Sequence, residues 1–324
     1  MIAGHDRQVA QFEQAWRAGT LHHAWLLAGP KGVGKAHFAR AAATRVLADA
    51  AGHAVALPGL ETPEEHPIAR LVEAGSHPDM RRLERLENPK TGALARNITV
   101  DQVRGLAELF DLTPSMSPWR AVVIDAADDL EKSAANALLK MLEEPPANCL
   151  FLLVSHAPGR LLPTIRSRCR RLDFQPLADD AMTSVLESQL PSLSEAERSR
   201  IVARAGGSVG RALAFAALDL AKLEDAALKI LREGDPTNAR RSELAQELGR
   251  KGAGERYAAF LDLVPALIAR QARGLEGPGL GRALDAYERS RELAALAPRV
   301  SLDPASTVFQ LGGILASVVA RPVP

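Results

Sequence analysis

Residues 24–36 read AWLLAGPKGVGKA, a short apolar run followed by a glycine-rich loop. The run predicts a β-strand, and helix-forming residues from Ala36 to Ala51 predict a helix directly after the loop. A loop of the form G-x-x-x-x-G-K-[ST] in that position cradles phosphate groups with backbone N–H groups, and its lysine reaches their outer charges. The residues that match are Gly29, Gly32, Gly34 and Lys35. The stretch therefore predicts a phosphate-loop (P-loop) fold.

The last position of this motif departs from the pattern. Ala36 stands where a Ser or Thr hydroxyl normally holds Mg²⁺. Because Mg²⁺ neutralises much of the charge in phosphoryl transfer, we expect an ATPase scaffold that does not itself hydrolyse ATP. The sequence leaves open whether ATP or a phosphate still binds to the loop.

Two further apolar runs, residues 121–125 and 150–155, each end in polar residues and enclose a predicted helix at 133–144. Continuous apolar runs are typical of parallel strands buried on both faces. Strands that alternate with helices predict an α/β domain whose ligands bind at the carboxyl ends of the strands. The polar residues expected at those ends are Lys35, Asp125 and Ser155.

Asp125 follows the P-loop by about 90 residues and resembles the Walker B aspartate that holds Mg²⁺. The glutamate that usually follows and activates water is replaced by Ala126. Asp128 is a candidate substitute for this glutamate. Because it lies three residues after Asp125, we expect its side chain to point away from the site. The alternative interpretation of this motif is a buried strand with a polar end.

Two basic segments remain. An arginine on the turn at 163–171 is a candidate finger for a neighbouring subunit's γ-phosphate, a contribution of about 10³–10⁵ in rate. Taken alone, the charge run favours an ordinary solvated turn. The segment 206–211 opens a helix in which Arg211 either faces a nucleotide or only helps to start the helix.

Length, net charge and cysteine content limit the classes of protein to which this chain can belong. A chain of 324 residues is long enough for two or three domains, and a net charge of +1 argues against one large basic face for nucleic acid. The only cysteines are Cys149 and Cys169, which suits a reducing compartment. We find no signal segment and no run of about 18 apolar residues, so we expect a cytoplasmic protein without membrane contact.

Strand signals stop near residue 175, and the rest of the chain shows only helical patterns. We therefore predict three domains. They are an α/β core with a degenerate P-loop at 1–174, a small helical lid at 175–212, and an all-helical collar for oligomerisation at 213–324.

Several strings together carry a resemblance to a known family. Residues 134–146 read AANALLKMLEEPP and include Asn136, residues 167–169 read SRC, residues 75–79 read GSHPD, and residues 22–24 read HHA. These strings resemble the delta-prime subunits of the bacterial DNA polymerase III clamp loader, a family of the AAA+ superfamily. The resemblance covers residues from about 4 to 211.

The resemblance implies a role in DNA replication. Motor subunits of this group (gamma and tau) keep the Ser or Thr after the loop lysine and a glutamate after the Walker B aspartate, so Ala36 and Ala126 favour the non-hydrolysing delta-prime type. Such a subunit acts as a stator in a heteropentamer with gamma or tau and delta, which loads a sliding clamp onto primer-template DNA. It has no ATPase or polymerase activity of its own, although it belongs to a nucleotidyltransferase holoenzyme.

The resemblance also implies residue roles. Arg168 is the expected catalytic arginine finger in trans, with Ser167, Cys169 and Asn136 as supporting motif residues. Ser155 corresponds to sensor 1 and Arg211 to sensor 2. The alternatives are a motor subunit that tolerates Ala36 and a pure scaffold without a finger.

Relatives often carry a four-cysteine zinc module after the first core helix. Residues 48–75 contain no cysteine, so we expect no zinc here. The sequence leaves open what replaces this module, and apolar packing of Leu57, Leu60, Ile68 and Leu71 is one candidate.

Overall fold

The computed structural model describes residues 2–52, 55–87, 94–218 and 220–319. Its internal contacts divide the chain into two compact units, residues 1–210 and 211–324. In the part of the chain that is described, none of the helices combines the length and the apolar character of a membrane span.

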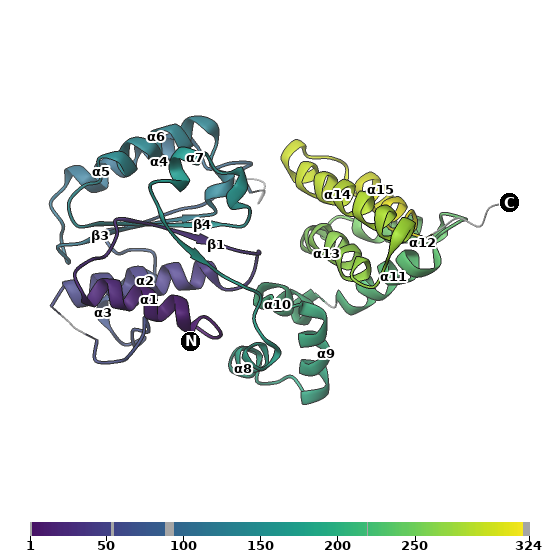
Figure 1. Ribbon diagram of the computed structural model, residues 1–324, viewed down its shortest axis with the longest axis horizontal. Helices are drawn as coiled ribbons and strands as arrows, with labels where there is room; N and C mark the ends of the chain where they lie inside the picture. Colours follow the sequence, from purple (N-terminus) through teal and green to yellow (C-terminus); the bar gives the residue numbers. More distant parts are fainter. Residues whose placement is uncertain (1, 53–54, 88–93, 219, 320–324) are drawn as a thin grey trace. The chain divides into compact units, whose positions relative to one another are not determined.

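The first unit is built on a parallel five-stranded sheet with the strand order β2-β3-β4-β1-β5 (Figure 1). The strands are β1 (Ala24–Ala28), β2 (Met80–Leu83), β3 (Arg120–Asp125), β4 (Cys149–Ser155) and β5 (Arg170–Asp173). In the register of the central strands, Ala28 pairs with Ser155 and Asp125 with Val154. The predicted α/β P-loop core with a parallel sheet is confirmed.

Helices cover both faces of this sheet. Figure 1 shows α1, α2 and α3 on one face and α4 to α7 on the other. These helices are α1 (Asp6–Arg17), α2 (Lys35–Ala50), α3 (Pro67–Glu73), α4 (Val100–Arg104), α5 (Leu106–Asp111), α6 (Lys132–Glu143) and α7 (Pro163–Arg166). With both faces covered, the central strands are apolar at nearly every position, as the sequence predicts.

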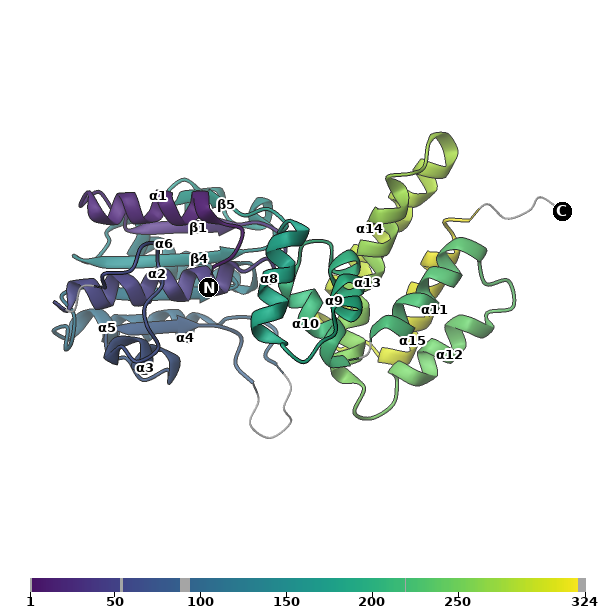
Figure 2. The same ribbon diagram turned by 90° about the horizontal axis from the view of Figure 1, so that it is seen from below.

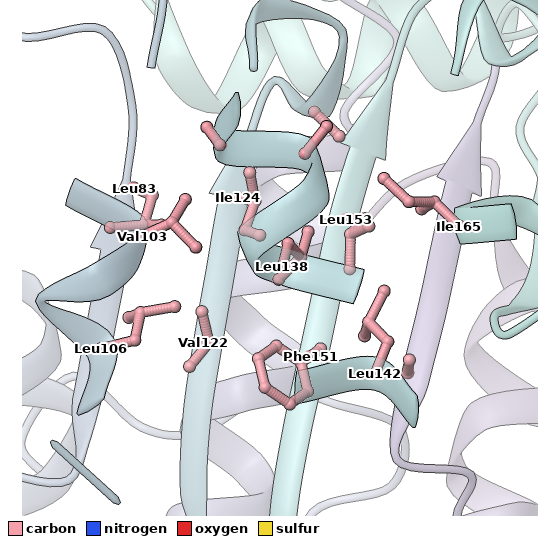
Figure 3. Packing of buried hydrophobic residues seen from close by; sticks show 14 of the residues in the cluster. Leu83, Val103, Leu106, Val122, Ile124, Leu138, Leu142, Phe151, Leu153 and Ile165 are labelled. Carbon is pink, nitrogen blue, oxygen red and sulfur yellow. The ribbon is translucent and has the colours of Figure 1, made fainter. Parts of the chain in front are cut away.

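The core between the sheet and α6 is a continuous apolar cluster. Figure 3 shows Leu138 of α6 lying against Ile124 of β3 and Leu153 of β4, with Val122 and Phe151 beside them. All five side chains are almost completely removed from water. Their burial fixes the carboxyl ends of β3 and β4, where Asp125 and Ser155 lie.

The strands β2 and β5 have no signal in the sequence. Both lie at sheet edges, both carry two exposed arginines, and each buries one leucine, Leu83 or Leu172. Charged side chains on an edge strand discourage pairing with further strands, and they also remove the apolar run that reveals a central strand.

A capping box formed by Thr99 and Gln102 begins α4. The apolar face that follows is divided between α4 and α5, which meet at Gly105. Its buried side chains are Val103, Leu106 and Leu109, whereas Ala107 is exposed.

The remaining elements are helical. They are α8 (Asp179–Gln189), α9 (Glu195–Ala205), α10 (Val209–Leu218), α11 (Leu220–Glu233), α12 (Ala239–Leu248), α13 (Gly254–Ala272), α14 (Gly277–Val300) and α15 (Pro304–Ala316). In the second unit α13 lies beside α14, and α12 beside α15 (Figure 2). Because the contact boundary falls at residue 210, inside α10, the three-domain division remains a prediction.

Candidate functional site

The P-loop lies between β1 and α2, and its glycines have positive φ angles. A Cβ atom on Gly29 (φ +154°) would lie 2.2 Å from the carbonyl oxygen of Phe174. A Cβ atom on Gly32 (φ +80°) would lie 2.3 Å from Oγ of Ser208. Both positions therefore require glycine, because other parts of the chain touch the loop there.

The loop lysine bonds to its own loop. Lys35 is buried, and its Nζ donates to the carbonyl oxygens of Gly29 at 2.7 Å and Pro30 at 2.5 Å. Burial lowers the pKa of Lys35 to about 8, although the carboxylates of Asp128 and Asp125 act in the opposite direction. The ammonium group that would contact a polyphosphate is thus engaged with protein carbonyls.

The next three carbonyls of the loop also have partners. Ser208 Oγ donates to Lys31 O at 3.2 Å, and Gly210 N–H donates to Gly32 O at 3.0 Å. His5 Nε2 lies 2.7 Å from Val33 O. Together with the two Lys35 bonds, these contacts give each carbonyl oxygen of residues 29–33 a partner within the protein. The loop is held by the protein itself.

The N–H side of the loop is different. The helix α2 begins at Lys35 without a side-chain cap, so its first N–H groups remain donors for an anion. The residues present fit a phosphate group at this position.

The residues around Asp125 do not fit Mg²⁺. The side chain of Ala36 is a methyl group, which cannot bind a metal ion. Asp125 Oδ2 lies 3.4 Å from Nη2 of the positively charged Arg82. Arg82 also pairs with Glu84 at 2.7 Å. Among the described residues, no group of three His, Cys, Asp or Glu side chains could hold a metal ion.

The Asp128 side chain forms hydrogen bonds with residues at the end of β4. Its carboxylate accepts hydrogen bonds from Ser155 Oγ at 2.9 Å and from the backbone N–H groups of His156 at 2.5 Å and Ala157 at 3.2 Å. The Ser155 side chain is fully buried in this arrangement. Asp128 thus fixes the turn after β4 and does not replace the water-activating glutamate.

The arginine turn is tied to the end of α6. Arg168 Nη2 lies 2.8 Å from Glu143 Oε1, and its Nη1 donates to Thr164 O at 3.0 Å. Ser167 Oγ donates to the same carbonyl at 3.1 Å. Ser167, one of the supporting motif residues, therefore helps to shape this turn.

The side chains of the two other motif residues, Cys169 and Asn136, lie in different surroundings. Burial raises the pKa of the Cys169 thiol to about 12, so this thiol stays protonated at neutral pH. Asn136 is exposed on α6.

Arg211, the expected sensor 2, lies in the second unit. Burial lowers the pKa of its guanidinium, against the charges of Asp262 and Glu224 of the same unit. The structure brings together Lys35, Asp125 and Ser155 at the carboxyl edge of the sheet. A role of Arg211 toward a nucleotide remains a prediction.

The role of Asp79 was not visible in the sequence. Its buried carboxylate accepts three backbone N–H groups, from Ser115 at 2.8 Å, Met116 at 2.7 Å and Ser117 at 3.0 Å. The only signal was the His-Pro-Asp string. Asp79 thus has a structural role, since it fixes the loop that leads into β3.

The region without cysteines is held by a buried arginine. Arg45 pairs with Asp49 at 3.0 Å and donates to the backbone oxygens of Val55, Leu57 and Glu61 at 2.8–3.2 Å. The candidate apolar packing is therefore only part of what holds this region. The Leu57 side chain is exposed, although Leu60 and Ile68 are buried.

Comparisons with known proteins match this chain to subunits of DNA polymerase III. The family model described as "DNA polymerase III, delta subunit" matches residues 4–178. The DNA polymerase III subunit delta' of Pseudomonas aeruginosa is 37% identical over 186 residues, or 57% of this chain and 53% of that protein. The DNA polymerase III subunit tau of Bacillus subtilis is 29% identical over 238 residues, or 70% of this chain and 39% of that protein.

Among solved structures, a DNA polymerase III gamma subunit-related protein from Thermotoga maritima superposes with a TM-score of 0.45 at 16% identity. The superposition covers 94% of this chain and 98% of that chain. The chain spans about half of the length of the delta' relative that it matches, and less of the tau subunit.

Proposed function

Because this chain belongs to the delta-prime subunit family of DNA polymerase III, we propose that it is a non-hydrolysing clamp-loader subunit. In this proposal it assembles with gamma or tau motor subunits and a delta subunit. The complex uses ATP to open a sliding clamp and to close it on primed DNA. This subunit supplies Arg168 in trans to the ATP site of a neighbouring motor subunit.

The observation that supports the non-hydrolysing role is the ion pair of Asp125 with Arg82, which places a positive charge beside the carboxylate expected to hold Mg²⁺. Ala36 and Ala126 remove the metal ligand and the base, and Asp128 is engaged elsewhere. If ATP were bound, the N–H groups at the start of α2 could donate to its phosphates. The residues nearby would not hold the Mg²⁺ ion that hydrolysis requires.

The setting of Arg168 supports the finger role. Its side chain is 34% exposed and that of Glu143 47%, so their ion pair is partly solvated. Such pairs contribute only about 0–1 kcal/mol. Exchanging Glu143 for a γ-phosphate would therefore cost little, and a finger can lower a barrier by about 4–7 kcal/mol.

A pure scaffold is the second candidate, and the same ion pair favours it, since Arg168 already has a partner within its own chain. The two candidates differ in what happens when Arg168 is removed from an assembled complex.

The test is reconstitution with motor and delta subunits, with ATPase measured in the presence of clamp and primed DNA. We expect Arg168→Ala to leave assembly on a sizing column intact and to lower ATPase. Arg166→Ala, an exposed arginine of the same turn, serves as the matched control and should have no effect. Unchanged ATPase in Arg168→Ala would support the scaffold, and Mg²⁺-dependent turnover by the chain alone would support a motor.

A further inference from the structure

The helix α6 is followed closely by two prolines, at positions 145 and 146. In a helix the carbonyl oxygen of residue i accepts a hydrogen bond from the N–H of residue i+4. Glu144 N–H still donates to Lys140 O, at 3.1 Å. Leu142 O would need the N–H of residue 146, but that residue is Pro146 and has none. To be satisfied within the protein, Leu142 O therefore needs a donor from another segment.

The side chain of His23 supplies that donor. Its Nε2 lies 3.2 Å from Leu142 O, across 119 residues of sequence. A carbonyl oxygen only accepts hydrogen bonds, so Nε2 carries the hydrogen of the ring. Burial lowers the pKa of His23, and the charge of His22 acts in the same direction. The ring is therefore a neutral donor at pH 7.

The His23 ring is itself held in place. The backbone oxygen of His23 accepts from Phe151 N–H at 2.7 Å, near the start of β4. The rings of His22 and His23 are stacked, with their centroids 4.3 Å apart. The hydrogen bond to Leu142 thus links the central sheet to the end of α6.

The end of α6 supports the base of the arginine turn. Helix α6 lies beside α7, and Leu142 and Ile165 are buried in the same apolar cluster (Figure 3). The backbone N–H of Arg168 donates to Ile165 O at 3.1 Å. A shift of Leu142 would therefore reach the backbone of Arg168, whether or not its guanidinium is paired with Glu143.

We infer that His23 is a positioning residue for Arg168: its Nε2–H replaces the donor that Pro146 lacks, and so fixes the end of α6 on which the arginine turn rests. This inference rests on the proposed function, in which Arg168 is the finger. A finger acts in the transition state, so a displaced finger lowers kcat and leaves the KM for ATP unchanged.

The test compares His23→Asn with His23→Gln in the reconstituted complex. The amide nitrogen of Gln reaches about as far as Nε2, whereas that of Asn ends near the position of Nδ1 and cannot reach Leu142 O. We expect His23→Asn to lower kcat of the ATPase about fivefold at unchanged KM, the factor that corresponds to about one hydrogen bond. His23→Gln should restore the wild-type kcat.

The matched control is His66→Ala. His66 accepts from Ile68 N–H, also at 3.2 Å, at the start of α3 on the other face of the sheet. This variant removes a helix-capping hydrogen bond of the same length at a place without contact to the arginine turn. It should leave kcat unchanged.

Hydrogen–deuterium exchange of the full chain measures the turn without a partner. Amides of residues 165–169 should exchange about fivefold faster in His23→Asn, and as in the wild type in His23→Gln. The inference is overturned if His23→Asn behaves like the wild type, if His23→Asn and His23→Gln are equally impaired, or if the turn loosens while kcat stays unchanged. Unchanged kcat in Arg168→Ala would instead overturn the finger proposal, and exchange of the turn would then decide alone whether His23 positions it.

Discussion

The Arg168 guanidinium lies 2.8 Å from a carboxylate oxygen of Glu143 and so joins the arginine turn to the last residue of α6. The two most specific strings of the sequence, at 134–146 and 167–169, are therefore in direct contact. Glu143 holds the guanidinium in a partly exposed position within its own chain.

We predict that Glu143→Gln frees Arg168 without harming the fold. The pair is partly solvated, so the free energy of unfolding should change by less than about 1 kcal/mol. ATPase of the reconstituted complex should stay at the wild-type level or rise, because the finger no longer has a competing partner. Glu144→Gln, at the exposed neighbouring residue, is the control. A loss of ATPase as large as that of Arg168→Ala would mean that Glu143 orients the finger.

The sequence was sufficient for the central sheet and the P-loop because their signals are local. The strands β1, β3 and β4 are apolar runs, and the loop is a contiguous motif. The edge strands β2 and β5 were missed because their arginines hide the pattern.

The side chains that bind the carbonyl oxygens of the P-loop could not be predicted from the sequence. His5 contacts Val33 from 28 residues away and Ser208 contacts Lys31 from 177 residues away. Such pairs depend on the packed fold, and no local pattern marks them. The same holds for Arg45, whose role requires the backbone oxygens of Val55 and Glu61 to turn toward it.

We predict that Arg45 is a main source of stability for the segment 55–61. Arg45→Ala removes the cation that pairs with Asp49 and leaves three backbone oxygens without this donor, so the free energy of unfolding should fall by about 3 kcal/mol. Arg104→Ala removes an exposed pair with Asp101 on α4 and should cost at most about 1 kcal/mol. Urea denaturation of the full chain measures both. Equal losses in the two variants would assign the stability of this segment to Leu60 and Ile68.

The pKa of Lys35 predicts a pH dependence of stability. Burial lowers this pKa from 10.5 to about 8, so between these values the unfolded chain binds a proton that the folded chain has released. Stability from this site therefore rises with pH in that window, and the full shift corresponds to about 3 kcal/mol.

Urea denaturation at pH 7 and pH 10 should show the wild type gaining up to about 3 kcal/mol relative to Lys35→Met. Lys132→Met, at an exposed lysine, should follow the wild type at both pH values. A constant difference between wild type and Lys35→Met would show that Lys35 keeps its proton throughout, and that the carboxylates of Asp125 and Asp128 outweigh burial.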